Sequence, residues 1–216
     1  MTETLREIYL VRHGQSLGQL DISNYKKIGD ANLPLTPLGQ EQAFKAGLQL
    51  RSKFQNAVAG QSGTDTPTIK IMHSTCRRAT ETAEHIARAL SILPVTTIPD
   101  DRLNKQAFGS FDGCFTAQER LDTDPEGYEA YEEHRAKDGL FHARPPKGES
   151  MHDVYARVES VLKSLRQEDG QHIIVTHGLP ILCAEAFYHG QTQDWIIEQQ
   201  DTIENCEIIP IMPPGL

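Results

Sequence analysis

Short apolar runs alternate along this chain with longer segments in which apolar residues recur at helical spacing. Short runs rich in β-branched residues predict buried strands. We expect such strands at residues 7–11, 68–72, 95–98 and 172–176. A last run at residues 204–211 predicts a strand at the edge of the sheet, ended by Pro210, because proline cannot donate a hydrogen bond to a neighbouring strand.

The segments between these runs carry apolar residues on one face of a helix. Thr36 followed by Pro37 is typical of a helix start, and Ser150 with Asp153 has the spacing of a capping box. We expect helices over residues 36–54, 79–90, 150–166 and 180–188, with loops at 14–33 and 56–67.

Residues 100–148 break this alternation. Glycines and Pro125 recur through the segment, which favours short helices and loops over one long element. We interpret it as a lid-like insertion in a single domain that covers residues 1–216. Because strands alternate with helices on either side of it, the chain predicts an α/β fold with a largely parallel central sheet.

Composition narrows the class of protein. The chain has 216 residues, 38% of them hydrophobic, with a formal net charge of −9. A globular domain with that charge is a poor ligand for nucleic acid or for a membrane surface. The start of the chain has no apolar signal segment, so we expect a cytoplasmic protein. The four cysteines have no paired spacing, which predicts neither a disulfide framework nor a zinc site.

Cations and histidines follow three of the predicted strands. Arg12, His13 and a glycine come after the first strand, Arg77 and Arg78 open the helix after the second, and His177 with Gly178 follows the fourth. The carboxyl ends of parallel strands meet at one edge of a sheet, which is where α/β proteins bind ligands. We therefore expect these side chains to converge.

Such a cluster suits phosphoryl chemistry. Guanidinium groups match phosphate oxygens, and helix N-termini offer free amides to an anion. An imidazole among these cations stays neutral and keeps a lone pair for attack. We expect glycines 14 and 178 to allow the backbone to approach the ligand closely.

The motifs that carry this pattern resemble those of the histidine phosphatase superfamily, in its phosphoglycerate mutase-like branch: YLVRHGQS, LPLTPLGQEQA, HSTCRRATETA, PPKGES and VTHG, in that order. The resemblance implies a three-layer α/β/α sandwich that needs no metal or cofactor. It implies that His13 is the nucleophile that accepts the phosphoryl group, that Arg12 and Arg78 clamp it, and that His177 contacts its oxygens.

Two positions depart from the family pattern. Gln19 stands where the family often has asparagine, and we expect it to contact phosphate with a shifted reach. Lys105 stands where the resemblance implies a general-acid glutamate. Four explanations stay open: Lys105 donates the proton, Asp112 or Glu149 replaces it, the substrate has a good leaving group, or the protein binds phosphorylated ligands without turnover.

The residues at the strand exits and the family resemblance together predict a phosphohydrolase. We expect it to act through a phosphohistidine on a small phosphorylated substrate or a phosphoprotein, with a bias towards good leaving groups. Alternatives are a weak or inactive phospholigand-binding homologue and a phosphoglycerate-type mutase. Cys114 and Arg120 have the Cys-x5-Arg spacing of cysteine phosphatases, but the loop between them lacks glycine and contains Glu119. The terminal edge strand makes a homodimer possible.

Overall fold

The computed structural model describes residues 8–59, 68–165, 168 and 170–211. The strands found in these ranges form one sheet in the order β3-β2-β4-β1-β5. Their bounds are β1 Ile8–Arg12, β2 Ile69–His73, β3 Val95–Pro99, β4 Gln171–Thr176 and β5 Ile208–Ile211. The first four run parallel and β5 is antiparallel to β1, so the predicted largely parallel sheet is confirmed.

The last strand lies at the sheet edge, as predicted, but it is shorter than the apolar run. Pro210 does not end it: the residue lies within β5, opposite Tyr9. An edge strand tolerates proline because one of its sides has no neighbouring strand to receive a hydrogen bond.

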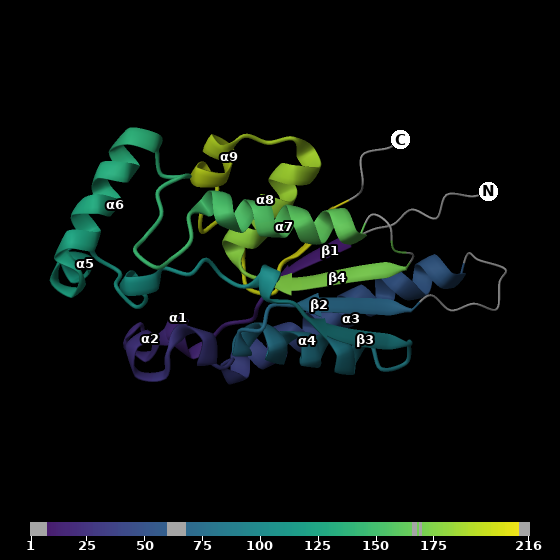
Figure 1. Ribbon diagram of the computed structural model, residues 1–216. Coiled ribbons are helices and arrows are strands. Elements are labelled where there is room, and N and C mark those ends of the chain that lie inside the picture. Colours follow the sequence, from purple (N-terminus) through teal and green to yellow (C-terminus); the bar gives the residue numbers. More distant parts are fainter. Residues whose placement is uncertain (1–7, 60–67, 166–167, 169, 212–216) are drawn as a thin grey trace.

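Helices cover both faces of the sheet (Figure 1). On one face lie α3 (Pro37–Ala59) and α4 (Arg77–Ala89). On the other lie α7 (Met151–Leu165), α8 (Gly178–His189) and α9 (Gln193–Glu198). The result is the three-layer α/β/α arrangement that the alternating pattern and the family resemblance implied.

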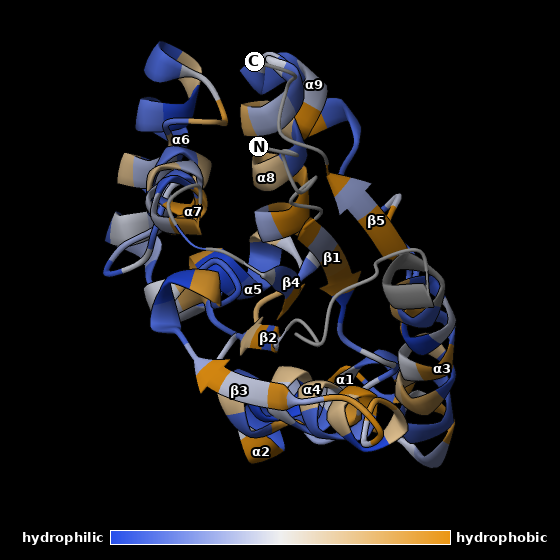
Figure 2. Ribbon diagram, turned by 90° about the vertical axis from the view of Figure 1, so that its right-hand side faces the viewer, coloured by the Kyte–Doolittle hydropathy of each residue, from blue (hydrophilic) through white to orange (hydrophobic). Residues whose placement is uncertain are grey.

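Alternation along the strands divides the core in two. Tyr9 and Val11 pack with α3 and α4, whereas Ile8 and Leu10 pack with α7 and α8. Successive residues of a strand point to opposite faces, so a strand covered on both sides reads as a continuous apolar run. Each large apolar side chain buried in this way contributes about 1.5–3 kcal/mol. Figure 2 shows hydrophobic residues gathered on the central strands and a largely hydrophilic α6 at the periphery.

Local sequence signals set the helix starts. Thr36 Oγ1 accepts a hydrogen bond from the amide of Gly39 at 3.0 Å. Ser150 N donates to Asp153 Oδ2 at 2.8 Å and Asp153 N donates to Ser150 Oγ at 3.2 Å, which confirms the capping box. Helix α3 continues to Ala59, past its predicted end. The rest of the loop predicted at 56–67, and the predicted helix end at 166, lie outside the described residues.

The prediction of a loop over residues 14–33 was wrong in part. That segment holds α1 (Leu17–Leu20), α2 (Ser23–Ile28) and the 3-10 turn η1 (Asp30–Asn32). These elements are too short to show hydrophobic periodicity, and none of them buries an apolar stripe. The segment therefore resembles a loop in sequence.

The insertion contains short elements, as predicted. They are η2 (Asp101–Leu103), η3 (Gly109–Phe111), α5 (Ala117–Thr123) and α6 (Pro125–Asp138). Phe111, Cys114, Tyr131 and Ala143 form a small core of their own. In Figure 1, α5 and α6 lie beyond the carboxyl ends of the strands, as do α1 and α2. No helix in the described ranges is long and apolar enough to cross a lipid bilayer.

Candidate active site

The ends of three neighbouring strands bring the predicted residues together. Strand β4 lies between β2 and β1, and Arg12 pairs with Thr176 at the carboxyl end of the ladder. The next residues in the two strands, His13 and His177, have ring centroids 5.0 Å apart, with the rings inclined at 61°. The predicted convergence is observed.

His13 is held with one ring nitrogen facing the arginine cluster. Its Nδ1 lies 2.8 Å from the carbonyl oxygen of Gly14, and because a carbonyl only accepts, Nδ1 carries the proton. Nε2 is then a free base, and Arg78 Nε donates to it at 3.3 Å. Burial, followed by the charge of Arg78, holds the pKa of His13 well below 6.5. The ring is therefore neutral near pH 7.

His177 is oriented by a chain of hydrogen bonds from the second strand exit. Its Nε2 donates to Ser74 Oγ at 2.9 Å, and Ser74 donates to Asn104 Oδ1 at 2.8 Å. Its Nδ1 lies 3.5 Å from Arg78 Nη2, which can only donate. Burial, then the proximity of His13, holds the pKa of His177 well below 6.5. An anion between the rings would favour a proton on Nδ1.

The two adjacent arginines of the second exit have different environments. Arg78 is 1% exposed and its Nη1 lies 3.0 Å from Asp30 Oδ1. Arg77 is exposed and donates to Glu81 at 2.7 Å, one turn along α4. The structure therefore places Arg78, and not Arg77, beside the histidines.

Arg12 lines the same cavity as His13. Its Nη1 donates to the carbonyl of Ile203, and its Nε is buried without a hydrogen-bond partner in the described part of the chain. Its charge is one cause of the lowered pKa of His13. Arg12 and Arg78 together make the space around His13 strongly attractive to an anion.

Lys105 also lines this cavity, and its ammonium group forms an ion pair with a carboxylate. Its Nζ lies 3.0 Å from Asp30 Oδ2 and 5.2 Å and 5.4 Å from the ring centroids of Tyr25 and Phe108. Asp30 thus bridges Lys105 and Arg78. Sequence reasoning missed Asp30, because it lies in the segment interpreted as a loop and belongs to no motif.

The two proposed replacements for the missing glutamate border the same hollow but have different partners. Glu149 receives two hydrogen bonds from Arg157, at 2.9 and 3.1 Å, and a third from Ala107 N at 3.0 Å. Neither Glu149 nor Asp112 lines the cavity that contains His13. Both border an adjacent hollow with Lys105. Glu149 is held there by Arg157, whereas burial raises the pKa of Asp112, which makes Asp112 the better candidate for a proton donor.

Gln19 lies at the edge of the site but its amide is already paired. The Oε1 atom accepts from Ser16 N at 3.0 Å, and Nε2 donates to Asn205 at 3.1 Å. Asn205 in turn donates to the carbonyl of His13 at 2.8 Å. Gln19 therefore supports the loop after β1 through Asn205, a residue that no sequence signal singled out.

The two glycines serve different purposes. A Cβ on Gly178 would meet no atom within 4 Å, so the first turn of α8 is open towards the cavity. A Cβ on Gly14 would lie 2.4 Å from the carbonyl oxygen of Gly39 in α3. The prediction for Gly14 was therefore wrong: the helix approaches it closely, so packing and not ligand access requires glycine there.

The residues around His13 open into a cavity of about 420 Å³ that extends under the insertion. Lys26 of α2 and Glu119 of α5 form an ion pair at 3.1 Å, and the rings of Tyr25 and Phe115, which both line the cavity, meet edge-on with centroids 5.2 Å apart. Lys26 and nearby amides lower the pKa of Glu119 to about 2, so this contact is ionised at neutral pH. The volume suits a small molecule.

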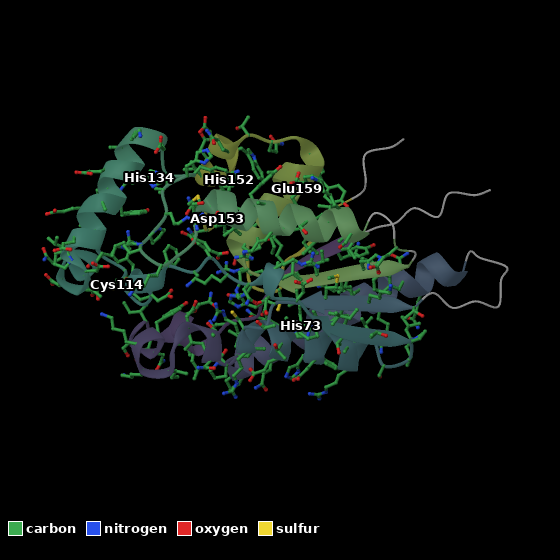
Figure 3. The ribbon with its side chains drawn as sticks, viewed as in Figure 1. His73, Cys114, His134, His152, Asp153 and Glu159 are labelled. Atoms are coloured by element: carbon green, nitrogen blue, oxygen red, sulfur yellow. The ribbon has the colours of Figure 1, made fainter. Side chains whose placement is uncertain are left out.

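The backbone of the loop between Cys114 and Arg120 argues against a cysteine phosphatase. Cys114 and Arg120 both line the cavity, and Figure 3 shows Cys114 beside α5. The amides of Phe115 and Thr116 donate to the Glu119 carboxylate, at 2.8 and 3.0 Å, and are not free to hold phosphate. The described residues contain no group of three or more histidine, cysteine or acidic side chains placed to bind a metal ion.

Comparison with known proteins agrees with this geometry. A family model for the histidine phosphatase superfamily (branch 1) matches residues 8–209. The chain belongs to that superfamily. It is 29% identical over 187 residues to the phosphoglycerate mutase-like protein AT74H of Arabidopsis thaliana, covering 81% of this chain and 62% of the relative. The chain thus spans about three fifths of that relative's length.

Other relatives carry mutase and phosphatase names. An Escherichia coli K12 protein named "Probable phosphoglycerate mutase GpmB" is 26% identical over 205 residues, covering 94% of this chain and 82% of the relative. A mycobacterial glucosyl-3-phosphoglycerate phosphatase solved with VO3 superposes with a TM-score of 0.64 at 22% identity, covering 95% and 90% of the two chains. This similarity of structure shows the shared fold.

Proposed function

We propose that this protein is a phosphohydrolase that transfers the phosphoryl group of a small phosphomonoester first to His13 and then to water. The observation that carries the proposal is the state of the His13 ring. Its Nδ1 proton is donated to Gly14, and its Nε2 lone pair faces a cavity in which Arg78 lies 3.3 Å away.

In the first step, the Nε2 lone pair of His13 attacks phosphorus in line with the ester oxygen. A P–N bond forms, the P–O bond breaks, and the leaving oxygen departs as an alcohol or as an anion. Arg12 and Arg78 offset the charge on the phosphoryl oxygens, and so does His177, whose ring takes up a proton from solvent when the dianion binds. One preorganised donor of this kind is worth about 10²–10³ in rate.

In the second step, water attacks phosphorus from the side that the leaving group vacated. The P–N bond breaks, inorganic phosphate forms, and His13 returns to the neutral ring with its proton still on Nδ1. The bond to Gly14 keeps the ring in one orientation through both steps, so that Nε2 is aligned each time. The same side chains around His13 contact the phosphoryl group in both steps.

The leaving-group side is where Lys105 acts. An ammonium paired with Asp30 at 3.0 Å supplies positive charge to a departing oxygen, while a carboxylic acid at that position would supply a proton. General-acid catalysis is worth about 10²–10⁴ in rate. Substrates whose leaving group needs no proton, such as aryl phosphates, are therefore favoured over alkyl phosphates. Of the two carboxylates near Lys105, we favour Asp112 over Glu149 as a proton donor, because burial raises its pKa.

Trapping tests the nucleophile. Rapid acid-free quenching of the enzyme with a ³²P-labelled aryl phosphate should label the protein at His13, and the label should be lost on acid treatment. A His13→Ala variant should neither label nor hydrolyse, whereas the exposed His152→Ala variant should do both. Labelling that survives in His13→Ala would refute the assignment.

A graded substrate series tests the role of Lys105. Rates with wild-type enzyme should fall steeply as the pKa of the leaving group rises. Lys105→Glu should speed alkyl phosphate hydrolysis by about 10- to 100-fold and flatten that slope, within the range of general-acid catalysis. A slope that is already flat in the wild type would instead indicate a working donor, and Asp112→Asn would then identify it.

The same experiments separate the alternatives. Saturable binding of phosphomonoesters with no turnover, and a His13→Ala variant that loses only affinity, would indicate a binding protein. Isomerisation of a phosphoglycerate without release of inorganic phosphate would indicate a mutase. We favour hydrolysis, because Lys105 removes the acid that a mutase needs in each direction of its reaction.

A further inference from the structure

The insertion contributes a cation to the cavity, in addition to Arg12, Arg78 and Lys105. Arg120, on α5, lines the same cavity as His13 and Arg78. Aromatic and apolar side chains also line it, among them Tyr25, Phe108, Phe115, Leu179 and Ile203. One bound molecule can therefore contact Arg78, Arg120 and these apolar groups.

Arg120 differs from the other arginines in and around the insertion. Arginines 102, 135, 144 and 157 each form an ion pair with a carboxylate. Arg120 forms none with any residue in the described ranges, and its Nε is buried without a hydrogen-bond partner. A buried charged donor left unpaired costs free energy, which a ligand that supplies the acceptor recovers.

The carboxylates nearest to Arg120 in sequence are occupied elsewhere. Glu119 pairs with Lys26, Asp122 accepts from Gln118 at 2.7 Å, and Asp124 accepts from the amide of Gly127 at 3.0 Å. Asp201 is the acidic side chain that lines the cavity, and it forms no ion pair with Arg120. The charge of Arg120 is therefore available to a ligand.

We propose that Arg120 binds a second anionic group of the substrate, a carboxylate or another phosphate, while the phosphomonoester lies at His13. The inference rests on the proposed function and narrows its substrate class to small phosphomonoesters that carry a second negative charge beyond an uncharged spacer. The guanidinium fork fits the paired oxygens of either group. The aromatic and apolar side chains that line the cavity contact the spacer.

Matched substrate pairs test this role. Phenyl phosphate and 4-carboxyphenyl phosphate differ by one carboxylate, and 2-naphthyl phosphate and 6-carboxy-2-naphthyl phosphate repeat the difference at a longer reach. Within each pair, the ratio of kcat/KM for the acid to that for the neutral ester is measured in wild-type enzyme and in Arg120→Gln. We expect that ratio to fall about 10- to 100-fold in the variant for at least one pair.

A control variant and a binding measurement keep the test decisive. Arg135→Gln removes an exposed arginine of α6 that pairs with Glu132, and it should leave both ratios unchanged. An unchanged ratio in Arg120→Gln for both pairs would overturn the inference. If the wild type hydrolyses none of the esters, the proposed hydrolysis fails by itself, and calorimetric affinities for the same pairs decide the role of Arg120.

Discussion

The two ends of the cavity are built in different ways. At the sheet end, His13 and His177 follow hydrogen-bonded parallel strands, so the ladder itself fixes their separation. At the insertion end, Arg120 comes from a seven-residue helix that packs on a small aromatic cluster and on α2. The first end suits a step common to all substrates, and the second suits recognition of particular ones. Substitutions at the two ends should therefore have different signatures.

The largest effect is expected at the sheet end, from the two adjacent arginines. Arg78→Lys should lower kcat/KM about 10²- to 10³-fold for every phosphomonoester, because it removes fixed donors beside the phosphoryl group. Arg77→Lys, the matched control, should change it less than twofold, since Arg77 pairs with Glu81 on the surface. Steady-state measurements of kcat/KM for both variants on two unrelated esters test this difference. A loss confined to one ester would contradict the division between the ends.

A glycine pair tests packing at the same end. Gly14→Ala should destabilise the fold by about 1–3 kcal/mol, because the new Cβ would lie 2.4 Å from a rigid backbone oxygen of α3. Gly178→Ala should leave the free energy of unfolding nearly unchanged, since its Cβ meets no neighbour. Urea unfolding monitored by circular dichroism measures both. Equal losses would mean that Gly14 has no special packing role.

Acid should weaken the fold through the sheet end. The pKa values of His13 and His177 lie well below 6.5 in the folded protein, mainly because of burial. Below about pH 6.5 the unfolded chain binds protons that the folded chain does not, so stability falls as the pH falls. Each histidine contributes up to about 1.4 kcal/mol per pH unit. Unfolding midpoints between pH 7.5 and 5.5 should decline less in His13→Gln than in wild type; parallel curves would refute this.

The smallest effect is expected where the insertion joins the main domain. Glu149→Gln should destabilise the protein by about 1 kcal/mol, because the carboxylate that Arg157 contacts is only partly buried. Its kcat on alkyl phosphates should stay within about threefold of wild type, since catalytic proton transfer would be worth far more. A large loss of kcat without loss of stability would restore Glu149 as the proton donor.

Several features could be predicted from the sequence because they depend on neighbouring residues. The apolar runs indicated the strands, and Ser150 with Asp153 indicated a helix start. The family pattern favoured Arg78 over Arg77, and the exposure of Arg77 agrees with that choice. Asp30 and Asn205 could not be predicted, because each depends on a partner far away in the chain, Lys105 and His13. The ion pair of Glu149 with Arg157 joins residues only eight apart, but no sequence motif marks it.

The sequence by itself determined which residues leave the strands and therefore that histidines and arginines gather at one edge, because parallel strands in one sheet share the direction in which they end. Only the tertiary structure decided which charges are neutralised. Asp30 pairs with both Arg78 and Lys105, while Arg120 forms no ion pair within the part of the chain that the structure describes. Ion pairing depends on distances of a few ångströms between segments far apart in sequence, and spacing along the chain does not encode those distances.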